Sequence, residues 1–233
     1  MRLIRIFYAP EKVFSELPEK RAWLLPMIAT ALVALATSQV VVNRIGLETI
    51  IRNQMESNPR TVERLGQAKI DEIAQRAASN TLVKGLTYAA PLIGTVVLLL
   101  VVAGVMAAAL ALTGSSARYD KILAVCAYSH FARGFVAGIM ATLTLAFMYD
   151  YSGVDLSALA RLNPTIFMDK AATARPLYSL ASSFDLLTFW CIFLIALGLS
   201  KAAPRLRFKK ALVVVAAPWA IYALLKMGLA AIF

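Results

Sequence analysis

Two basic side chains stand close together in one of the most apolar stretches of the chain. His130 is the only histidine, and Arg133 follows it by three residues in AYSHFARGFVAG (127–138). Two further charges, Asp185 and Lys226, interrupt other apolar runs. A charge inside an apolar segment costs free energy unless it is paired, so such residues are candidates for function. We take these four as the candidate functional polar residues.

The sequence lacks the residue patterns that catalysis and metal binding require. No HExxH or GxSxG motif occurs, and no motif places an acid to orient a pair formed by Ser129 and His130. We interpret TGSSAR (113–118) as a polar turn. Two cysteines, Cys126 and Cys191, and one histidine cannot complete a four-ligand zinc site unaided. The sequence therefore predicts no enzyme, no catalytic residue, no metal site and no cofactor.

The composition indicates that lipid surrounds most of the chain. Of 233 residues, 60% are apolar and 16% are charged, whereas soluble domains have about 45–50% and about 25%. The net charge of +11 would suggest nucleic-acid binding in a soluble protein. Here the basic residues cluster at the ends of apolar runs, and no nucleic-acid-binding motif occurs. We expect a membrane protein without a nucleic-acid partner.

Five apolar runs match the length of membrane-spanning helices. A helix of about 17–25 residues crosses a hydrocarbon core about 30 Å thick and satisfies its backbone hydrogen bonds internally. The predicted fold is therefore all-α, a five-span transmembrane helix bundle forming a single domain over residues 1–233. The expected spans are about 22–42, 86–112, 132–148, 182–199 and 211–232. We do not interpret the first as a cleaved signal peptide, because acids precede it and apolar residues continue beyond its A-x-A site.

Two segments outside the spans have amphipathic patterns. In 3–17, Pro10 begins a short helix with its apolar side chains on one face, so we expect an interfacial N-terminal helix. Residues 43–84 have apolar side chains at three- to five-residue steps and a turn at 57–59. This pattern predicts an extracytoplasmic amphipathic helical hairpin. The alternative is solvated helices that only join two spans.

Positive charge is unequal on the two sides of the predicted spans. Residues 1–21, 114–121 and 200–210 hold 12 Lys/Arg in 40 residues, whereas 43–84 and 149–179 hold 10 in 73. Positive loops remain in the cytoplasm, so we expect the N-terminus inside and the C-terminus outside. Basic clusters attract anionic lipids. The candidate lipid-facing residues are Lys201, Arg205, Arg207, Lys209 and Lys210.

Helix contacts are predicted at two places. Gly134 and Gly138 form a GxxxG pattern, which lets two helices approach closely in lipid. Asp185, near the start of span four, and Lys226, near the end of span five, would lie on the same side and could form an ion pair. The alternative is that Asp185 caps its helix and Lys226 extends to the surface.

Three stretches of the chain resemble the Yip family, Rab-associated membrane proteins, in its bacterial branch. They are FYAPEKVFSELPEKRAWLLPMI (7–28), AVCAYSHFARGFVAGIM (124–140) and the last two spans within 183–225. The resemblance implies five spans, a cytosolic N-terminus and a role in membrane organisation or trafficking. From the basic clusters and the resemblance together, the expected partners are the lipid bilayer, anionic lipids, and a membrane-protein partner or a second copy of the chain. The expected location is the inner membrane of a bacterium. Eukaryotic relatives associate with Rab-type GTPases, which a bacterial member need not do.

The resemblance also bears on the third span. Members often carry a proline where this chain has Ala132 and Arg133, which implies two helices. One helix over 120–148 would be about 43 Å long and would hold Arg133 near mid-bilayer. We therefore expect a break at 132–134, with Arg133 at headgroup level beside lipid phosphate or Glu11 and Glu16. The alternative is one tilted helix whose arginine extends to the surface.

The residues and the resemblance together predict a non-enzymatic membrane protein. Its basic cytoplasmic face would organise the membrane or partner proteins. The alternative is a small transporter, channel or lipid-translocating protein in which the four candidate polar residues line a path. His130 and Arg133 lie toward one side of the membrane, and Asp185 and Lys226 lie toward the other. Few polar residues lie between the two pairs, which favours the first interpretation.

Overall fold

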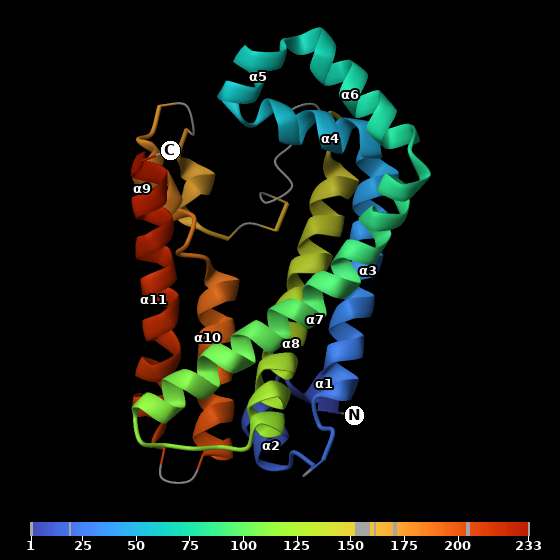
Figure 1. Ribbon diagram of the computed structural model, residues 1–233. Coiled ribbons are helices and arrows are strands. Elements are labelled where there is room, and N and C mark those ends of the chain that lie inside the picture. Colours follow the sequence, from blue (N-terminus) through green and yellow to red (C-terminus); the bar gives the residue numbers. More distant parts are fainter. Residues whose placement is uncertain are drawn as a thin grey trace. The chain divides into compact units, whose positions relative to one another are not determined.

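Helices form the protein (Figure 1). The computed structural model describes residues 2–18, 20–151, 159–160, 162–169, 172–203 and 206–232, and no strand occurs among them. The elements are α1 (Arg2–Arg5), α2 (Pro10–Ser15), α3 (Leu24–Ile45), α4 (Leu47–Glu56), α5 (Pro59–Leu65), α6 (Gln67–Ser79), α7 (Thr81–Leu112), α8 (Tyr119–Phe147), η2 (Pro164–Phe167), α9 (Arg175–Ala181), α10 (Leu186–Ala202) and α11 (Phe208–Ile232).

Four of these helices are long and apolar enough to cross a membrane: α3, α7, α8 and α11. Helix α10 has 17 residues. Together with α9, from which it is bent by 48°, it makes up a fifth candidate span. Within the described part of the chain there are thus four or five candidate spans. The predicted fold class, an all-α membrane helix bundle, is confirmed.

Helix α8 is continuous, so the predicted break at 132–134 is wrong. It has 29 residues, which makes it about 43 Å long at 1.5 Å per residue. Ala132 and Arg133 are good helix formers, and Gly134 costs only about 1 kcal/mol relative to alanine. Without a proline at this point, no residue forces the backbone out of the helix. Residues 119–131 are the first half of this span.

The chain divides into two compact units. Unit 1 comprises Met1–Thr30, Val96–Phe135 and Arg161–Phe233, and unit 2 comprises Ala31–Thr95 and Val136–Ala160. In unit 1, α10 packs against α11 and against the short helix α2, and α9 packs against α11. Helices α3, α7 and α8 each contribute residues to both units.

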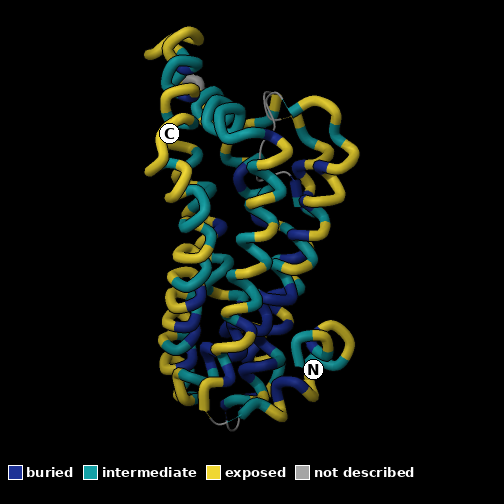
Figure 2. Tube along the Cα trace, turned by 90° about the vertical axis from the view of Figure 1, so that its right-hand side faces the viewer, coloured by how far each residue is buried: buried dark blue, intermediate teal, exposed yellow. Residues whose placement is uncertain are grey.

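Unit 1 is most tightly packed where α2, α8 and α10 meet. Val13 and Phe14, on the apolar face of α2, are buried, as is the run from Ile122 to Ser129 on α8 (Figure 2). Gly198 of α10 makes this contact possible. A Cβ at that position would lie 2.4 Å from Val125 Cγ1 and 3.1 Å from Phe14 Cδ1. The apolar face of α2 is therefore covered by protein.

Unit 2 contains the helices predicted as a hairpin over 43–84. Helix α4 packs against α6, and Arg52 Nε lies 2.8 Å from Asp71 Oδ1 between them. The turn into α6 passes through Gly66 at φ 72°, a backbone conformation that favours glycine. Helix α5 joins the two, and Asn58 caps it by accepting from the N–H of Arg60 at 3.1 Å.

Candidate functional site

A cavity of about 490 Å³ lies in unit 1 between α7, α8, α10 and α11. His130 and Arg133 of α8 line it together with Thr188 and Cys191 of α10. Residues three apart on a helix share a face, so each pair projects in one direction from its helix. The α7 and α11 walls are apolar or aromatic. They consist of Leu98, Val101, Val102, Val105, Met106, Val215, Pro218, Trp219 and Tyr222.

The imidazole of His130 is oriented by its own helix. Its Nδ1 lies 2.9 Å from the backbone oxygen of Cys126. A carbonyl oxygen only accepts, so Nδ1 carries a proton in this contact. Cys191 Sγ lies 3.9 Å from the same Nδ1. The two candidate polar residues of α8 are thus joined in this cavity by side chains of α10.

Arg133 has a buried Nε without a hydrogen-bond partner among the described residues. The acids expected beside it are engaged elsewhere. Glu16 Oε2 pairs with Arg5 at 2.8 Å, and Glu11 Oε1 pairs with Lys201 at 2.6 Å. The predicted contact of Arg133 with these glutamates is therefore wrong, since the unbroken helix holds the arginine in the cavity wall.

Asp185 and Lys226 have separate partners. Asp185 caps α10: its Oδ1 accepts from the N–H of Thr188 at 3.0 Å, and its Oδ2 accepts from the N–H of Leu162 at 3.1 Å. Lys226 Nζ donates to Ser182 Oγ at 2.6 Å. Among the described residues no ion pair joins the two. The predicted ion pair is therefore wrong. The structure has the helix cap of the alternative interpretation, and Lys226 binds a serine of unit 1.

The two glycines of the GxxxG pattern lie on the α3 side of α8. A Cβ at Gly138 would lie 2.6 Å from Thr37 Oγ1, so glycine permits this approach within unit 2. At Gly134 the nearest atom within unit 1 would be Thr30 Cγ2 at 4.0 Å. That is an ordinary contact distance, so only Gly138 is closely packed.

Basic residues gather where α10 ends and α11 begins. Lys201 Nζ donates to Glu11 Oε1, and this hydrogen bond together with the positive charge lowers the pKa of Glu11 below its usual value. Lys210 Nζ donates to the backbone oxygen of Thr113 at 3.1 Å. These contacts bring α2, the end of α7 and the α10–α11 connection to one end of unit 1.

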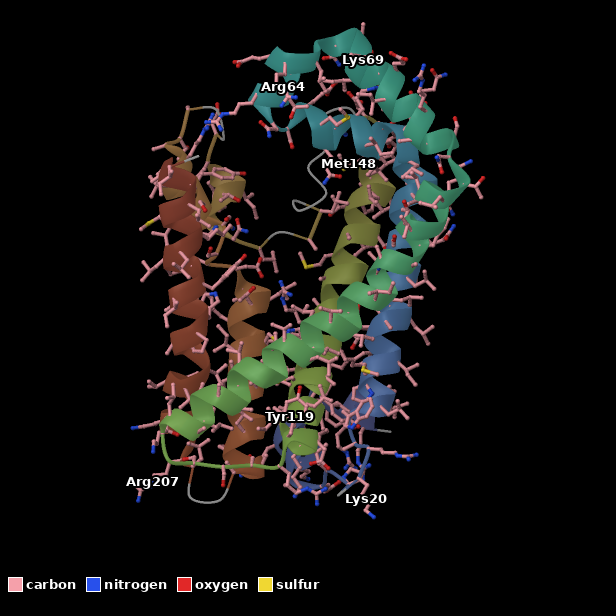
Figure 3. All side chains as sticks on the ribbon, in the orientation of Figure 1. Lys20, Arg64, Lys69, Tyr119, Met148 and Arg207 are labelled. Atoms are coloured by element: carbon pink, nitrogen blue, oxygen red, sulfur yellow. The ribbon has the colours of Figure 1, made fainter. Side chains whose placement is uncertain are left out.

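Other cations at this end face solvent or headgroups. Arg207 and Lys209 are exposed, and Figure 3 shows Arg207 and Lys20 at this end of the unit. Arg205, the fifth predicted lipid-facing residue, lies outside the described residues.

The feature of the cavity that suits an anion is Arg133. Its guanidinium supplies a positive charge and N–H donors within largely apolar walls, whereas the Nδ1–H of His130 is already bound to the Cys126 oxygen and the hydroxyl of Thr188 lies 3.4 Å from Asp185 Oδ1. Within the described residues no three His, Cys, Asp or Glu side chains are grouped to hold a metal ion.

Three residues of unit 1 were missed from the sequence. Thr188 and Cys191 share the cavity face of α10 with Ile192 and Ile195, a spacing of three, four and seven residues that a helical projection of 186–202 would have revealed. Gly198 stands alone in an apolar run, and the sequence has no spacing signal that distinguishes it from other glycines.

A comparison with protein-family models matches residues 4–230 to the Yip1 domain. This match covers nearly the whole chain, including both units and every residue that lines the cavity. Comparisons with curated proteins and with solved structures gave no match.

Proposed function

The chain belongs to the Yip1 family, and on this premise we propose that it is a non-enzymatic protein that organises the membrane through its basic end. The family and the apolar helices establish an integral membrane protein. The proposed role is to gather anionic lipids around unit 1 and to present this surface to membrane-protein partners or to a second copy of the chain.

The meeting of three basic segments at one end of unit 1 is the observation that carries this proposal. Residues 1–21, 114–121 and 200–210 are the segments rich in Lys and Arg. The Lys201–Glu11 and Lys210–Thr113 hydrogen bonds bring their helices together. Each Lys or Arg near a membrane surface contributes about 1 kcal/mol of attraction to anionic lipid.

The distribution of polar residues in unit 1 supports this role over transport. Polar side chains continue from Asp185 through Thr188 to His130. Between His130 and the basic end, the apolar side chains of Ile122 to Ala127 on α8 are buried. Gly198 lets α10 pack closely against Val125 in the same region. A polar path across the unit would have to pass through this packing.

The proposed orientation places the basic end in the cytoplasm of a bacterial cell, at the inner membrane. The N-terminus is then cytoplasmic and the C-terminus extracytoplasmic. A reporter that is active only outside the cytoplasm should function after Phe233 and fail after Lys201. The opposite result at both positions would reverse the orientation.

The lipid contact is tested by spin-label measurements of lipid selectivity in reconstituted vesicles of phosphatidylglycerol and phosphatidylcholine. The wild type should prefer phosphatidylglycerol at low salt. Replacing the three basic residues at the start of α11 by glutamine should reduce this preference by about tenfold or more, because about 1 kcal/mol of attraction is lost for each charge and about 1.4 kcal/mol corresponds to tenfold. This variant carries Arg207→Gln, Lys209→Gln and Lys210→Gln.

The matched control removes three exposed cations from the 43–84 region, through Arg60→Gln, Arg64→Gln and Lys84→Gln. It has the same net charge as the test variant and should retain most of the preference. Equal loss in both variants would show that total charge, and not the basic end, attracts the lipid, and the proposal would fail.

A further inference from the structure

Arg133 lies at the centre of a candidate membrane span. It is 14 residues from each end of α8, which corresponds to about 21 Å in either direction. A cation at such a depth is costly unless something compensates its charge. Its buried Nε has no partner among the described residues. None of the ion pairs among the described residues involves Arg133, and an anion from outside the chain would supply its partner.

The cavity that Arg133 lines opens on the outer surface of the bundle. Its rim on α7 is exposed, with Val101 at 57% and Leu98 at 49%, and so is Tyr222 of α11 at 61%. By contrast, Cys191 and Ile195 on α10 are buried. The mouth thus lies between α7 and α11, two helices apolar enough to cross a membrane. A ligand entering between two such helices comes from among the lipid acyl chains.

The two sides of the cavity differ in polarity. On the α8 and α10 side, Arg133 supplies a fixed cation with N–H donors, and His130 and Thr188 are its polar neighbours in the cavity wall. On the α7 and α11 side, the lining is mostly aliphatic, with the aromatic rings of Trp219 and Tyr222. Such a cavity accommodates an amphiphile whose anionic group meets the arginine and whose chain lies along α7 and α11. A zwitterionic headgroup would add a second cation next to Arg133.

We propose that this cavity is a binding site for one anionic membrane lipid, with its phosphate paired to Arg133 and its acyl chain seated between α7 and α11. Binding gives the buried Nε of Arg133 a partner and fills the cavity with hydrocarbon. About 490 Å³ is within the usual range of small-ligand pockets, about 300–1,000 Å³. The site is separate from the basic end and does not depend on the proposed function.

The test uses the full chain in detergent micelles with Trp219 as the single tryptophan, through Trp23→Phe and Trp190→Phe. Bromine atoms on a lipid chain quench a nearby indole, and Trp219 lines the cavity. Phosphatidylglycerol with brominated chains should quench Trp219 saturably. Brominated phosphatidylcholine should require about tenfold more lipid. Arg133→Gln should raise the half-saturating phosphatidylglycerol about tenfold or more, the size expected for loss of one charge-assisted hydrogen bond.

Controls separate the site from general effects of charge and from soluble anions. Arg118→Gln removes an exposed cation paired with Asp120 and should leave quenching unchanged. Glycerol phosphate, a headgroup without chains, should not displace the lipid. Val105→Phe puts a larger side chain at the exposed rim of the cavity, leaves Arg133 intact and should weaken quenching. If Arg133→Gln does not fold, the result for Val105→Phe tests the proposal by itself. Equal quenching by both lipids, unchanged quenching in Arg133→Gln or Val105→Phe, or displacement by glycerol phosphate would overturn the proposal.

Discussion

Replacing Gly198 by alanine should destabilise the protein at the contact of α2, α8 and α10. The new Cβ would lie 2.4 and 2.9 Å from the two methyl groups of Val125 and 3.1 Å from Phe14 Cδ1. Both Val125 methyls are in the way, so rotating this buried side chain moves one of them and leaves the other in conflict. The helices must separate instead.

The magnitude follows from two opposing effects. Overpacking of this kind costs about 1–3 kcal/mol, whereas alanine in place of glycine stabilises a helix interior by about 1 kcal/mol. Gly104→Ala in α7 provides the matched control, because no atom lies within 4 Å of its added Cβ. The control should therefore be neutral or slightly stabilising. The free energies of unfolding of the two variants should differ by about 1–3 kcal/mol.

The measurement is unfolding by titration with sodium dodecyl sulfate from a mild detergent, followed by far-UV circular dichroism. The same substitution is then made in a Val125→Ala background, which removes both obstructing methyls. In that background the loss of unfolding free energy caused by Gly198→Ala should be smaller, because only the contact of the new Cβ with Phe14 remains. Equal stabilities of Gly198→Ala and Gly104→Ala, or a loss unaffected by Val125→Ala, would refute the packing argument.

Two further predictions concern charged groups. Asp185→Ala removes the cap of α10 and the bond to the N–H of Leu162, and should lower the free energy of unfolding by about 0.5–2 kcal/mol. Because no ion pair is present, its effect should add to that of Lys226→Met; a coupling above about 0.5 kcal/mol in the double mutant would contradict this. The lowered pKa of Glu11 means that its contact with Lys201 stabilises the fold above the usual glutamate pKa, and this contribution disappears as the pH falls through the lowered pKa. Unfolding at about pH 6 and about pH 3 should show a smaller pH dependence for Glu11→Gln than for the wild type, and an identical dependence would count against the contact.

The apolar runs predicted the membrane helices because lipid imposes a simple requirement on length and hydropathy. The expected run at 22–42 corresponds to α3, and the run at 211–232 corresponds to α11. The break in α8 was inferred from a proline that other members carry. Residue types alone predict the continuous helix, since Ala132 and Arg133 both favour it.

The site was harder to predict because it depends on how helices are rotated about their axes. His130 and Arg133 were recognised as unusual from their apolar surroundings. The sequence alone does not show which face of α10 lies opposite them, and it is the face that carries Thr188 and Cys191. The ion pair expected for Asp185 competes with backbone N–H groups that lie within reach of the same carboxylate. The carboxylate of Asp185 therefore accepts from these N–H groups and does not pair with Lys226.

The docking of α2 against α10 has a consequence for biosynthesis. Phe14 is synthesised about 180 residues before Gly198, its neighbour in the finished fold. At about 5–20 residues per second, the N-terminal helix waits roughly 10–40 seconds at the ribosome before its binding surface exists. Its apolar face, with Val13 and Phe14, is uncovered for that time. A chaperone, the insertion machinery or the membrane surface would shield it meanwhile, and its docking would be among the last steps of assembly.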